Sequence, residues 1–176
     1  MAEHRIKVEE IRAKAPDLHA GDRVYLSGTV YTARDAAHKR MTALLDEGKE
    51  LPISLQGACI YYAGPTPAEP GAVIGSCGPT TSGRMDRFAP RFLDLGLAAM
   101  IGKGQRSAQV VEAIVRNKAV YLCAVGGAGA LAAQSVRSCE EIAFHDLGCE
   151  SVKRLTVQDF PLIVAIDSAG NNLFER

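Results

Sequence analysis

Three short segments of the chain each place a cationic side chain beside residues that favour a tight turn. Arg34 follows an apolar run, Arg84 lies in the segment Cys77-Gly-Pro-Thr-Thr-Ser-Gly-Arg-Met-Asp86, and Lys103 stands between two glycines. The arginine fork matches a carboxylate, and lysine presents one compact charge. Glycine lets the backbone approach a ligand closely. These three cations, called the clamp residues below, therefore predict a binding site for a small dianion.

Hydroxyl side chains accompany the second of these segments. Thr80, Thr81 and Ser82 follow a strand-breaking Gly-Pro pair and are suited to the N-terminus of a helix. Hydroxyls beside free backbone N–H groups favour anion binding, so Thr80 and Thr81 are expected to bind the same ligand as Arg84. Taken singly, the segments have simpler explanations: a capped helix with an exposed Arg84 and an ordinary turn at Lys103.

Two carboxylates and a histidine lie close to the clamp residues in the sequence. Asp35 and His38 follow Arg34, and Asp86 follows Arg84. We expect these three side chains to contact and orient the clamp residues. For His38, the alternatives are a surface position with its polar atoms hydrogen-bonded and an acid–base role. The sequence has no H-E-x-x-H motif and no Ser-His-Asp set with a nucleophile elbow. It therefore predicts diacid binding without a complete catalytic apparatus.

The hydrophobic pattern predicts alternating strands and helices. Apolar and β-branched runs indicate strands at 23–32, 58–63, 72–77, 97–101, 119–125, 155–160 and 161–167, with a turn at 168–172. Helical spacing indicates helices at 33–48, near 88–95, from about 107, and at 130–134. This alternation is typical of an α/β domain with a mixed sheet and flanking helices.

Such a sheet would position the cationic segments at one edge. Ligands of open α/β sheets bind at the carboxyl ends of strands, so the turns at 32–35, 78–84 and 102–106 are expected to converge. No linker or internal repeat interrupts the sequence, which predicts one domain over 1–176 with residues 1–20 as a lead-in.

The bulk composition excludes several classes of function. Twenty basic and 20 acidic residues leave no net charge to attract nucleic acid or an anionic membrane. No apolar run approaches the ~20 residues of a membrane span. The charged first 18 residues lack the apolar centre of a signal peptide, so a cytoplasmic location is expected.

The five cysteines and a glycine run offer weaker alternatives. No two cysteines have C-x-x-C spacing, so reduced thiols are expected and no metal ligands, with Cys77 the first candidate for a redox-sensitive thiol. The run Gly126-Gly-Ala-Gly129 lacks G-x-G-x-x-G spacing. Close packing explains it more simply than a nucleotide site.

The same segments, in this order, resemble the class I fumarase and tartrate dehydratase family. The similarity covers about residues 20–175 and runs through Thr29–Arg40, Tyr61–Pro65, Gly78–Asp86, Gly102–Arg106 and Val157–Pro161. The resemblance implies a single swivelling β/β/α domain. It also implies the β subunit of a hydro-lyase for a C4 dicarboxylate, fumarate/malate first and tartrate as the alternative; a non-catalytic dianion-binding module is the competing hypothesis.

The resemblance also implies roles for individual residues. Arg34, Arg84 and Lys103 would grip the substrate carboxylates, and Thr80 would stand at the carbon that loses or gains a proton. A [4Fe–4S] cluster, held by a partner α subunit and not by this chain, would take the substrate hydroxyl as a Lewis acid. Threonine needs an activator, which we expect from an α-subunit carboxylate. A hetero-oligomer is expected, inactive without α, with a homodimer possible for the isolated chain.

Overall fold

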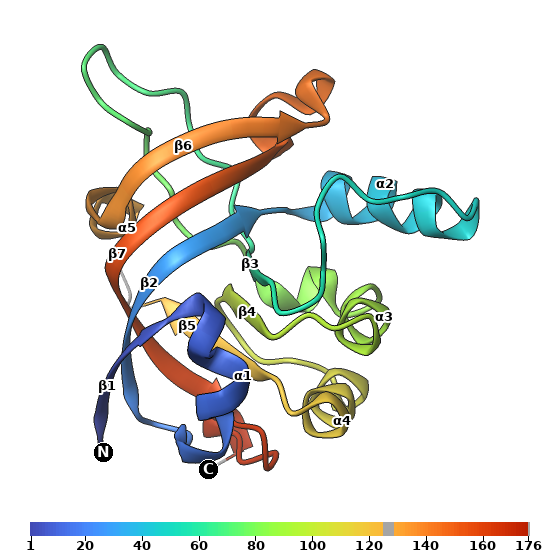
Figure 1. The fold of residues 1–176 in the computed structure, drawn as a ribbon, viewed down its shortest axis with the longest axis vertical. Coiled ribbons are helices and arrows are strands. Elements are labelled where there is room, and N and C mark those ends of the chain that lie inside the picture. The colour runs from blue at the N-terminus through green and yellow to red at the C-terminus, as the bar shows by residue number, and fades with distance from the viewer. Residues whose placement is uncertain (125–128, 176) are drawn as a thin grey trace.

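A mixed seven-stranded sheet forms the centre of the molecule (Figure 1). The computed structural model describes residues 1–124 and 129–175. Its strands follow the spatial order β1-β2-β3-β4-β5-β7-β6. They comprise β1 (Glu3–Lys7), β2 (Arg23–Thr32), β3 (Cys59–Tyr61), β4 (Ala99–Gly102), β5 (Val120–Ala124), β6 (Val136–Ala143) and β7 (Val152–Ile166). Strands β1 to β5 run parallel to their neighbours, and β7 runs antiparallel to β2, β5 and β6.

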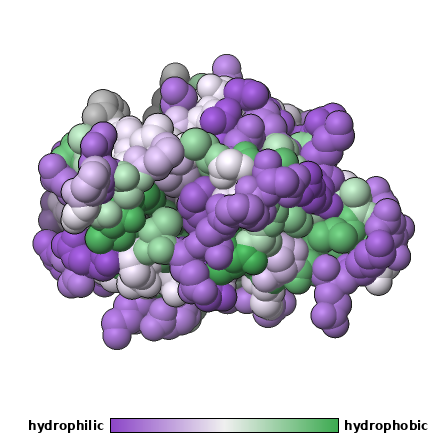
Figure 2. All heavy atoms as spheres, turned by 90° about the horizontal axis from the view of Figure 1, so that it is seen from above, coloured by the Kyte–Doolittle hydropathy of each residue, from purple (hydrophilic) through white to green (hydrophobic). Residues whose placement is uncertain are grey.

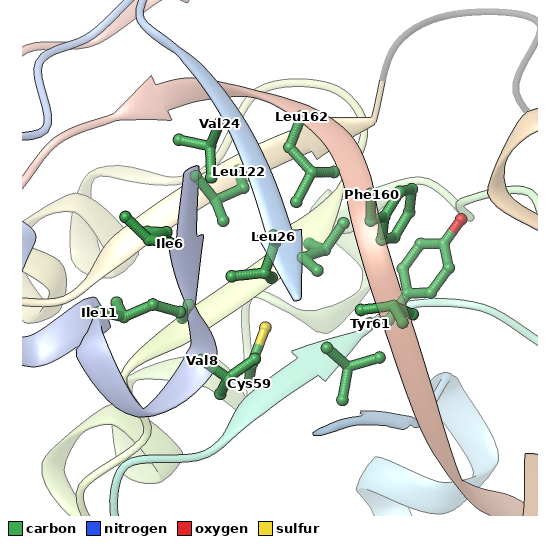
Figure 3. Packing of buried hydrophobic residues seen from close by; sticks show 14 of the residues in the cluster. Ile6, Val8, Ile11, Val24, Leu26, Cys59, Tyr61, Leu122, Phe160 and Leu162 are labelled. Carbon is green, nitrogen blue, oxygen red and sulfur yellow. The ribbon is translucent and has the colours of Figure 1, made fainter. Parts of the chain in front are cut away.

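Strand β7 closes the sheet on itself. It pairs with β5 through its last residues and with β2 along most of its length. The pairings β2–β3–β4–β5–β7–β2 therefore form a ring, which encloses one hydrophobic cluster. Leu26, Tyr61, Phe160 and Leu162 lie in this cluster, with Ile6 and Ile11 packed from the N-terminal segment (Figure 3).

The helices cover the outside of the ring. Helices α2, α3 and α4 lie on one side of the sheet, where a second hydrophobic cluster separates them from the strands (Figure 1). The α-helices are α1 (Ile11–Lys14), α2 (Asp35–Asp46), α3 (Ala89–Asp94), α4 (Ala108–Asn117) and α5 (Gly129–Ser135). Short 3-10 helices occur at η1 (Val8–Glu10), η2 (Ala15–Asp17), η3 (Ser82–Met85), η4 (His145–Glu150) and η5 (Leu173–Glu175).

The predicted α/β class with a mixed sheet and flanking helices is confirmed. In β2, Val24, Leu26 and Val30 are buried in alternation, as the period of a strand requires. In α4, the Ser107 hydroxyl accepts a hydrogen bond from the Val110 N–H, and Lys118 ends the helix in the left-handed conformation. Local sequence therefore determines where these elements begin and end.

Two local predictions were wrong. Residues 72–77 form no strand in the structure, and the predicted pair of strands at 155–167 is the single long strand β7. The positive φ of Asp159 absorbs the break in apolar alternation, so the strand continues through it. Residues 1–20, the predicted lead-in, pack against the rest of the domain: β1 pairs with β2, and Ile11 and Leu18 are fully buried.

Candidate active site

The carboxyl ends of β2, β3 and β4 bring the three cationic turns together. The Ala33 N–H donates to the Tyr61 carbonyl over 3.0 Å, and the Thr80 N–H donates to the Tyr62 carbonyl over 2.7 Å. Thr81 pairs with Lys103 as an isolated parallel bridge. The turns after these strands are thus joined by backbone hydrogen bonds, as their positions in a parallel sheet predict.

Asp35 lies between the two arginines of the clamp. Its Oδ2 is 2.9 Å from Arg84 Nε, and its Oδ1 is 3.8 Å from Arg34 Nε. Glu150 Oε1 is 3.9 Å from the same Arg34 nitrogen and accepts a hydrogen bond from the Ala36 N–H. Arg34 Nε and Asp35 Oδ1 are buried, and within the described part of the chain neither has a hydrogen-bond partner. One polar atom of each side chain is therefore buried without a hydrogen bond, although both side chains remain about 30% exposed, and this is costly unless a ligand completes the pair.

Thr80 and Lys103 occupy the neighbouring turns. Lys103 is exposed and Thr80 is half-buried, so both are accessible from solvent. The Thr80 N–H bond to Tyr62 fixes the backbone of this residue, while its hydroxyl forms no hydrogen bond with the described residues. The arrangement leaves the hydroxyl free for a ligand or for a group from another chain.

The prediction of a capped helix after Pro79 was wrong, because the element there is shorter and has no side-chain cap. Thr81 is the N-cap of η3, a 3-10 helix of 4 residues, and its side chain makes no capping hydrogen bond. A turn this short aligns few backbone dipoles. The backbone of this turn therefore contributes little to the predicted anion site, and the cationic side chains remain its candidates.

Gly102 allows the two loops to touch. A Cβ at this position would lie 1.9 Å from Ser82 Oγ and 2.8 Å from the Tyr62 ring. Ser82 Oγ and the Gly104 carbonyl both lie 2.7 Å from the Tyr121 hydroxyl, and the Ser82 N–H donates to the Lys103 carbonyl over 2.9 Å. Only glycine permits this packing, which holds the Lys103 loop against the Thr80–Arg84 loop.

Asp86 and Arg106 form a second link between these loops. Arg106 Nε donates to Asp86 Oδ1 over 2.6 Å, and the Ser107 N–H donates to Asp86 Oδ2 over 2.7 Å. The expected support by Asp86 therefore has a structural counterpart. Arg106 belongs to the quoted Gly102–Arg106 motif, but the sequence did not single it out.

The expectation of a surface position for His38 was wrong. Its ring is buried among Tyr62, Phe88 and Phe92, and Nδ1 lies 2.8 Å from the Arg34 carbonyl oxygen. Burial lowers the pKa of His38 to about 4 from its ordinary 6.5. His38 therefore holds the backbone of Arg34 as a neutral ring and has no access to a ligand.

Sequence reasoning missed Glu150, Tyr62 and Tyr121. Glu150 lies 114 positions away from Ala36, to which it is hydrogen-bonded, so no local pattern signals it. The two tyrosines read as ordinary apolar strand residues, and their hydroxyls acquire partners only when β3, β5 and the loops assemble. Their contribution is a property of the tertiary structure.

The cysteines do not gather into a ligand set. Among the described residues, no group of three His, Cys, Asp or Glu side chains is placed to hold a metal ion, so this part of the chain does not provide an iron–sulphur ligand set. Burial raises the pKa of the Cys77 thiol to about 12, which suppresses the reactive thiolate. Residues 126–128 of the glycine run lie outside the described residues.

A separate pocket of about 380 Å³ lies outside the candidate site. It is formed by the 65–74 segment, β6 and η4, and it includes Cys139, Cys149 and Lys153 but none of the clamp residues.

Seen from above, hydrophobic patches interrupt a mainly polar surface (Figure 2). No helix of the described residues is long and apolar enough to span a membrane.

The chain is an α/β domain whose candidate site gathers cationic side chains at the carboxyl edge of the sheet. Residues 2–176 match the family model described as "Fumarase C-terminus", and the chain belongs to this family. It is 39% identical over 171 residues to "Fumarate hydratase class I, anaerobic" of Escherichia coli (strain K12), covering 96% of this chain and 31% of that protein. It is 37% identical to "L(+)-tartrate dehydratase subunit beta" of the same organism, covering 96% of this chain and 83% of that subunit.

The chain corresponds to only part of the fumarate hydratases. "Fumarate hydratase 1, mitochondrial" of Leishmania major is 42% identical over 156 residues, which is 88% of this chain and 28% of that protein. The chain thus spans about a third of the length of these relatives. The remaining two thirds of such a protein have no counterpart in this sequence.

Proposed function

We propose that this chain is the substrate-clamping β module of a hydro-lyase that reversibly hydrates a C4 dicarboxylate, fumarate to malate. One observation carries the proposal. At the carboxyl edge of the sheet, Asp35 lies between Arg34 and Arg84, and the buried Arg34 Nε and Asp35 Oδ1 have no hydrogen-bond partner among the described residues; Thr80 and Lys103 are accessible in the neighbouring turns. The family membership supports the same reaction class.

The charges at this edge suit a dianion only if a partner completes the site. Arg34 and Arg84 are ion-paired with Asp35 and Glu150, which balances their charges, and Lys103 in the neighbouring turn adds one net positive charge. Removing a proton beside a carboxylate adds negative charge to the substrate, and fixed cations stabilise that charge. One net charge falls short of a dianion, so a partner must supply further positive charge.

Thr80 is the proposed proton-transfer residue. Its hydroxyl has no hydrogen-bond partner among the described residues, so this part of the chain offers no base to activate it. A carboxylate of a partner α subunit is the proposed activator. The [4Fe–4S] cluster of class I enzymes is also assigned to that partner, and every role given to this chain is binding, orientation or proton transfer.

The proposed assembly is a hetero-oligomer in the cytoplasm. The tartrate dehydratase relative is named a β subunit, which supports a separate α subunit as partner. We expect the isolated chain to bind dicarboxylates weakly and to lack turnover, because half of the site is missing.

Tartrate dehydration is the second candidate. The relative that carries this name is covered over 83% of its length, and its identity of 37% is close to that of the fumarate hydratases. Tartrate also carries two carboxylates, so the clamp residues cannot distinguish it from malate. The substrate is therefore determined by groups that contact the hydroxyls.

The test is anaerobic reconstitution with a cluster-binding α subunit encoded beside this chain. Malate, fumarate and both tartrate enantiomers are assayed with the wild-type complex, with Arg34→Ala and with Arg84→Ala. Turnover of one substrate that falls by about 100-fold or more in both variants supports the proposal, since each lost contact is a charge-assisted hydrogen bond.

A matched control separates the clamp from surface charge in general. Arg91→Ala removes an exposed arginine that is ion-paired with Asp46 on α2, away from the clamp. Its kcat/KM should stay within about twofold of wild type, as exposed ion pairs contribute little. A stable complex with an intact cluster and no turnover of any of these substrates would leave a dianion-binding module as the better account.

A further inference from the structure

Arg106 is the most completely enclosed charged side chain near the clamp. Its side chain is 0% exposed, and its guanidinium bonds Asp86 Oδ1 over 2.6 Å and the Tyr62 hydroxyl over 3.2 Å. The guanidinium carbon also lies 4.7 Å from the centre of the Tyr121 ring. A buried arginine is expensive, and packed apolar residues of similar volume often serve stability as well or better. Its position therefore calls for an explanation beyond core packing.

The contacts of Arg106 join elements that carry different clamp residues. Tyr62 follows β3 and holds the Thr80 N–H through its carbonyl. Asp86 ends the loop that carries Arg84, and its other oxygen accepts the Ser107 N–H from the loop that carries Lys103. One guanidinium thus connects the support of Thr80, the end of the Arg84 loop and the end of the Lys103 loop.

We propose that Arg106, together with Asp86, is a positioning pair that sets the separation between Lys103 and the Thr80–Arg84 loop, and so matches the clamp to a dicarboxylate of one length. This inference rests on the proposed function, because it concerns the same site. Arg106 itself touches no ligand in this proposal. Its planar fork is what a lysine cannot replace, since lysine offers a single point charge.

The proposal has a consequence that a purely structural role lacks. A dicarboxylate binds through cations on both loops, so a change in loop separation weakens its grip. A monocarboxylate needs only one of the loops and should be less affected. A variant that merely reduced the amount of folded enzyme would lower the maximal rate and leave inhibition constants unchanged.

The experiment compares inhibition constants in the reconstituted complex with α. Succinate and butyrate serve as C4 probes with two carboxylates and one carboxylate. In Arg106→Lys, the inhibition constant of succinate should rise about tenfold, as expected for the loss of charge-assisted hydrogen bonds. That of butyrate should change less than about threefold, because it depends on one loop only.

Arg116→Lys is the matched control. Arg116 also forms a fork with an aspartate, through Nε and Nη2 to Asp94 at 3.0 and 3.1 Å, but it is exposed on α4. Both inhibition constants should be unchanged in this variant. Asp86→Asn is the second test variant, for use if Arg106→Lys does not fold; it should raise the succinate constant selectively as well.

The results separate this inference from the proposed function. Equal succinate-to-butyrate ratios in wild type and in the folded Arg106 and Asp86 variants of an active complex overturn the positioning role alone. If the wild-type complex has no turnover, the proposed function fails, and the positioning role is tested by hydrogen exchange in the isolated chain. Faster exchange of the Ser82 and Ser107 amides in Arg106→Lys than in Arg116→Lys is then expected, and equal rates would overturn it.

Discussion

One aspartate lies at each end of the parallel strands, and the two aspartates differ in how completely their oxygens are hydrogen-bonded. At the amino end, Asp22 is 5% exposed and accepts hydrogen bonds from the N–H groups of Ala2 and His19, while His4 lies 2.9 Å from its Oδ2. At the carboxyl end, Asp35 has one oxygen on Arg84 and one buried oxygen without a hydrogen-bond partner among the described residues.

The difference indicates a division of labour between the two ends. A carboxylate whose lone pairs are all occupied contributes to stability, because breaking any contact exposes a buried polar group. A carboxylate left partly unsatisfied beside two arginines costs stability, and proteins retain such sites where function requires them. We therefore expect substitution of Asp22 to change mainly stability and substitution of Asp35 to change mainly activity.

The largest expected effect comes from Thr80→Val, which tests the carboxyl end directly. Valine keeps the shape of threonine and removes only the hydroxyl, so kcat of the reconstituted complex should fall by about 100- to 10,000-fold. Inhibition by succinate should change by less than about threefold, since the clamp cations remain. Steady-state kinetics measure both quantities.

Thr42→Val provides the control for this substitution. The Thr42 hydroxyl is buried in α2 and has no hydrogen-bond partner within the described part of the chain. Its removal should leave kcat unchanged and leave the free energy of unfolding equal or higher. A fall in kcat of less than tenfold in Thr80→Val would contradict the assignment of proton transfer to this residue.

This division was only partly visible in the sequence. Arg34, Arg84 and Lys103 were found because each follows a strand and carries turn residues, and parallel strands bring such turns to one edge. The position of Asp35 between the two arginines was not predicted, because Asp35 and Arg84 are 49 positions apart in the sequence. Burial of His38 was missed because its aromatic neighbours come from two separate segments, the end of β3 and the start of α3.

The fold was more predictable where local pattern decides. The strand at 23–32 was predicted with its observed bounds because alternation and β-branched residues agree there. Strand β6 has no such signal, since half of Val136–Ala143 is exposed and polar and its stability comes from pairing with β7. Long-range pairing, including the closure of β7 on β2 and β5, lies beyond local periodicity.

Acidification should weaken the carboxyl end through His38. Burial lowers the pKa of His38 to about 4 in the folded protein, so between pH 6.5 and 4 only the unfolded chain gains this proton. The free energy of unfolding should therefore fall as pH drops through this window, by up to about 3 kcal/mol from this residue. Urea unfolding at several pH values measures the slope.

His38→Phe should flatten that slope. Phenylalanine keeps the contacts with Tyr62, Phe88 and Phe92 but cannot take up a proton. Stability at pH 7 should fall modestly, because the bond to the Arg34 carbonyl is lost. If the free energy of unfolding of the variant depended on pH as steeply as that of wild type, other groups would titrate in this window. His38 would then not be the cause of the acid sensitivity.

Gly102→Ala should disturb the contact between the two clamp loops. The new methyl group would meet Ser82 Oγ and Tyr62, so one loop must move, at a cost of about 1–3 kcal/mol in unfolding free energy. Gly83→Ala is the control in the same loop, because its Cβ would meet nothing nearer than the Gln105 carbonyl at 3.8 Å. Equal thermal stability of the two variants would contradict the tight packing inferred at Gly102.

The smallest effects give the most direct comparison of the two ends, through Asp22→Asn and Asp35→Asn. Asparagine keeps the size of each side chain and removes its charge. Asp22→Asn should lower the free energy of unfolding by about 1–2 kcal/mol and leave KM unchanged. Asp35→Asn should leave stability within about 0.5 kcal/mol and raise KM several-fold. The half-exposed Arg84 then loses the ion pair that orients it.

The pH dependence of unfolding distinguishes the two aspartates further. Burial raises the pKa of Asp22, but hydrogen bonds from His19, His4 and Ala2 outweigh it and lower the pKa to about 2 from 3.8. The stability contributed by Asp22 is therefore present above pH 4 and is lost as pH falls from about 4 to 2, because the unfolded chain takes up the proton first. Asp22→Asn should abolish this loss, while Asp35→Asn should retain it. If both variants kept the same acid sensitivity and the same KM as wild type, the two aspartates would be equivalent, and the unsatisfied oxygen of Asp35 would no longer indicate a ligand site.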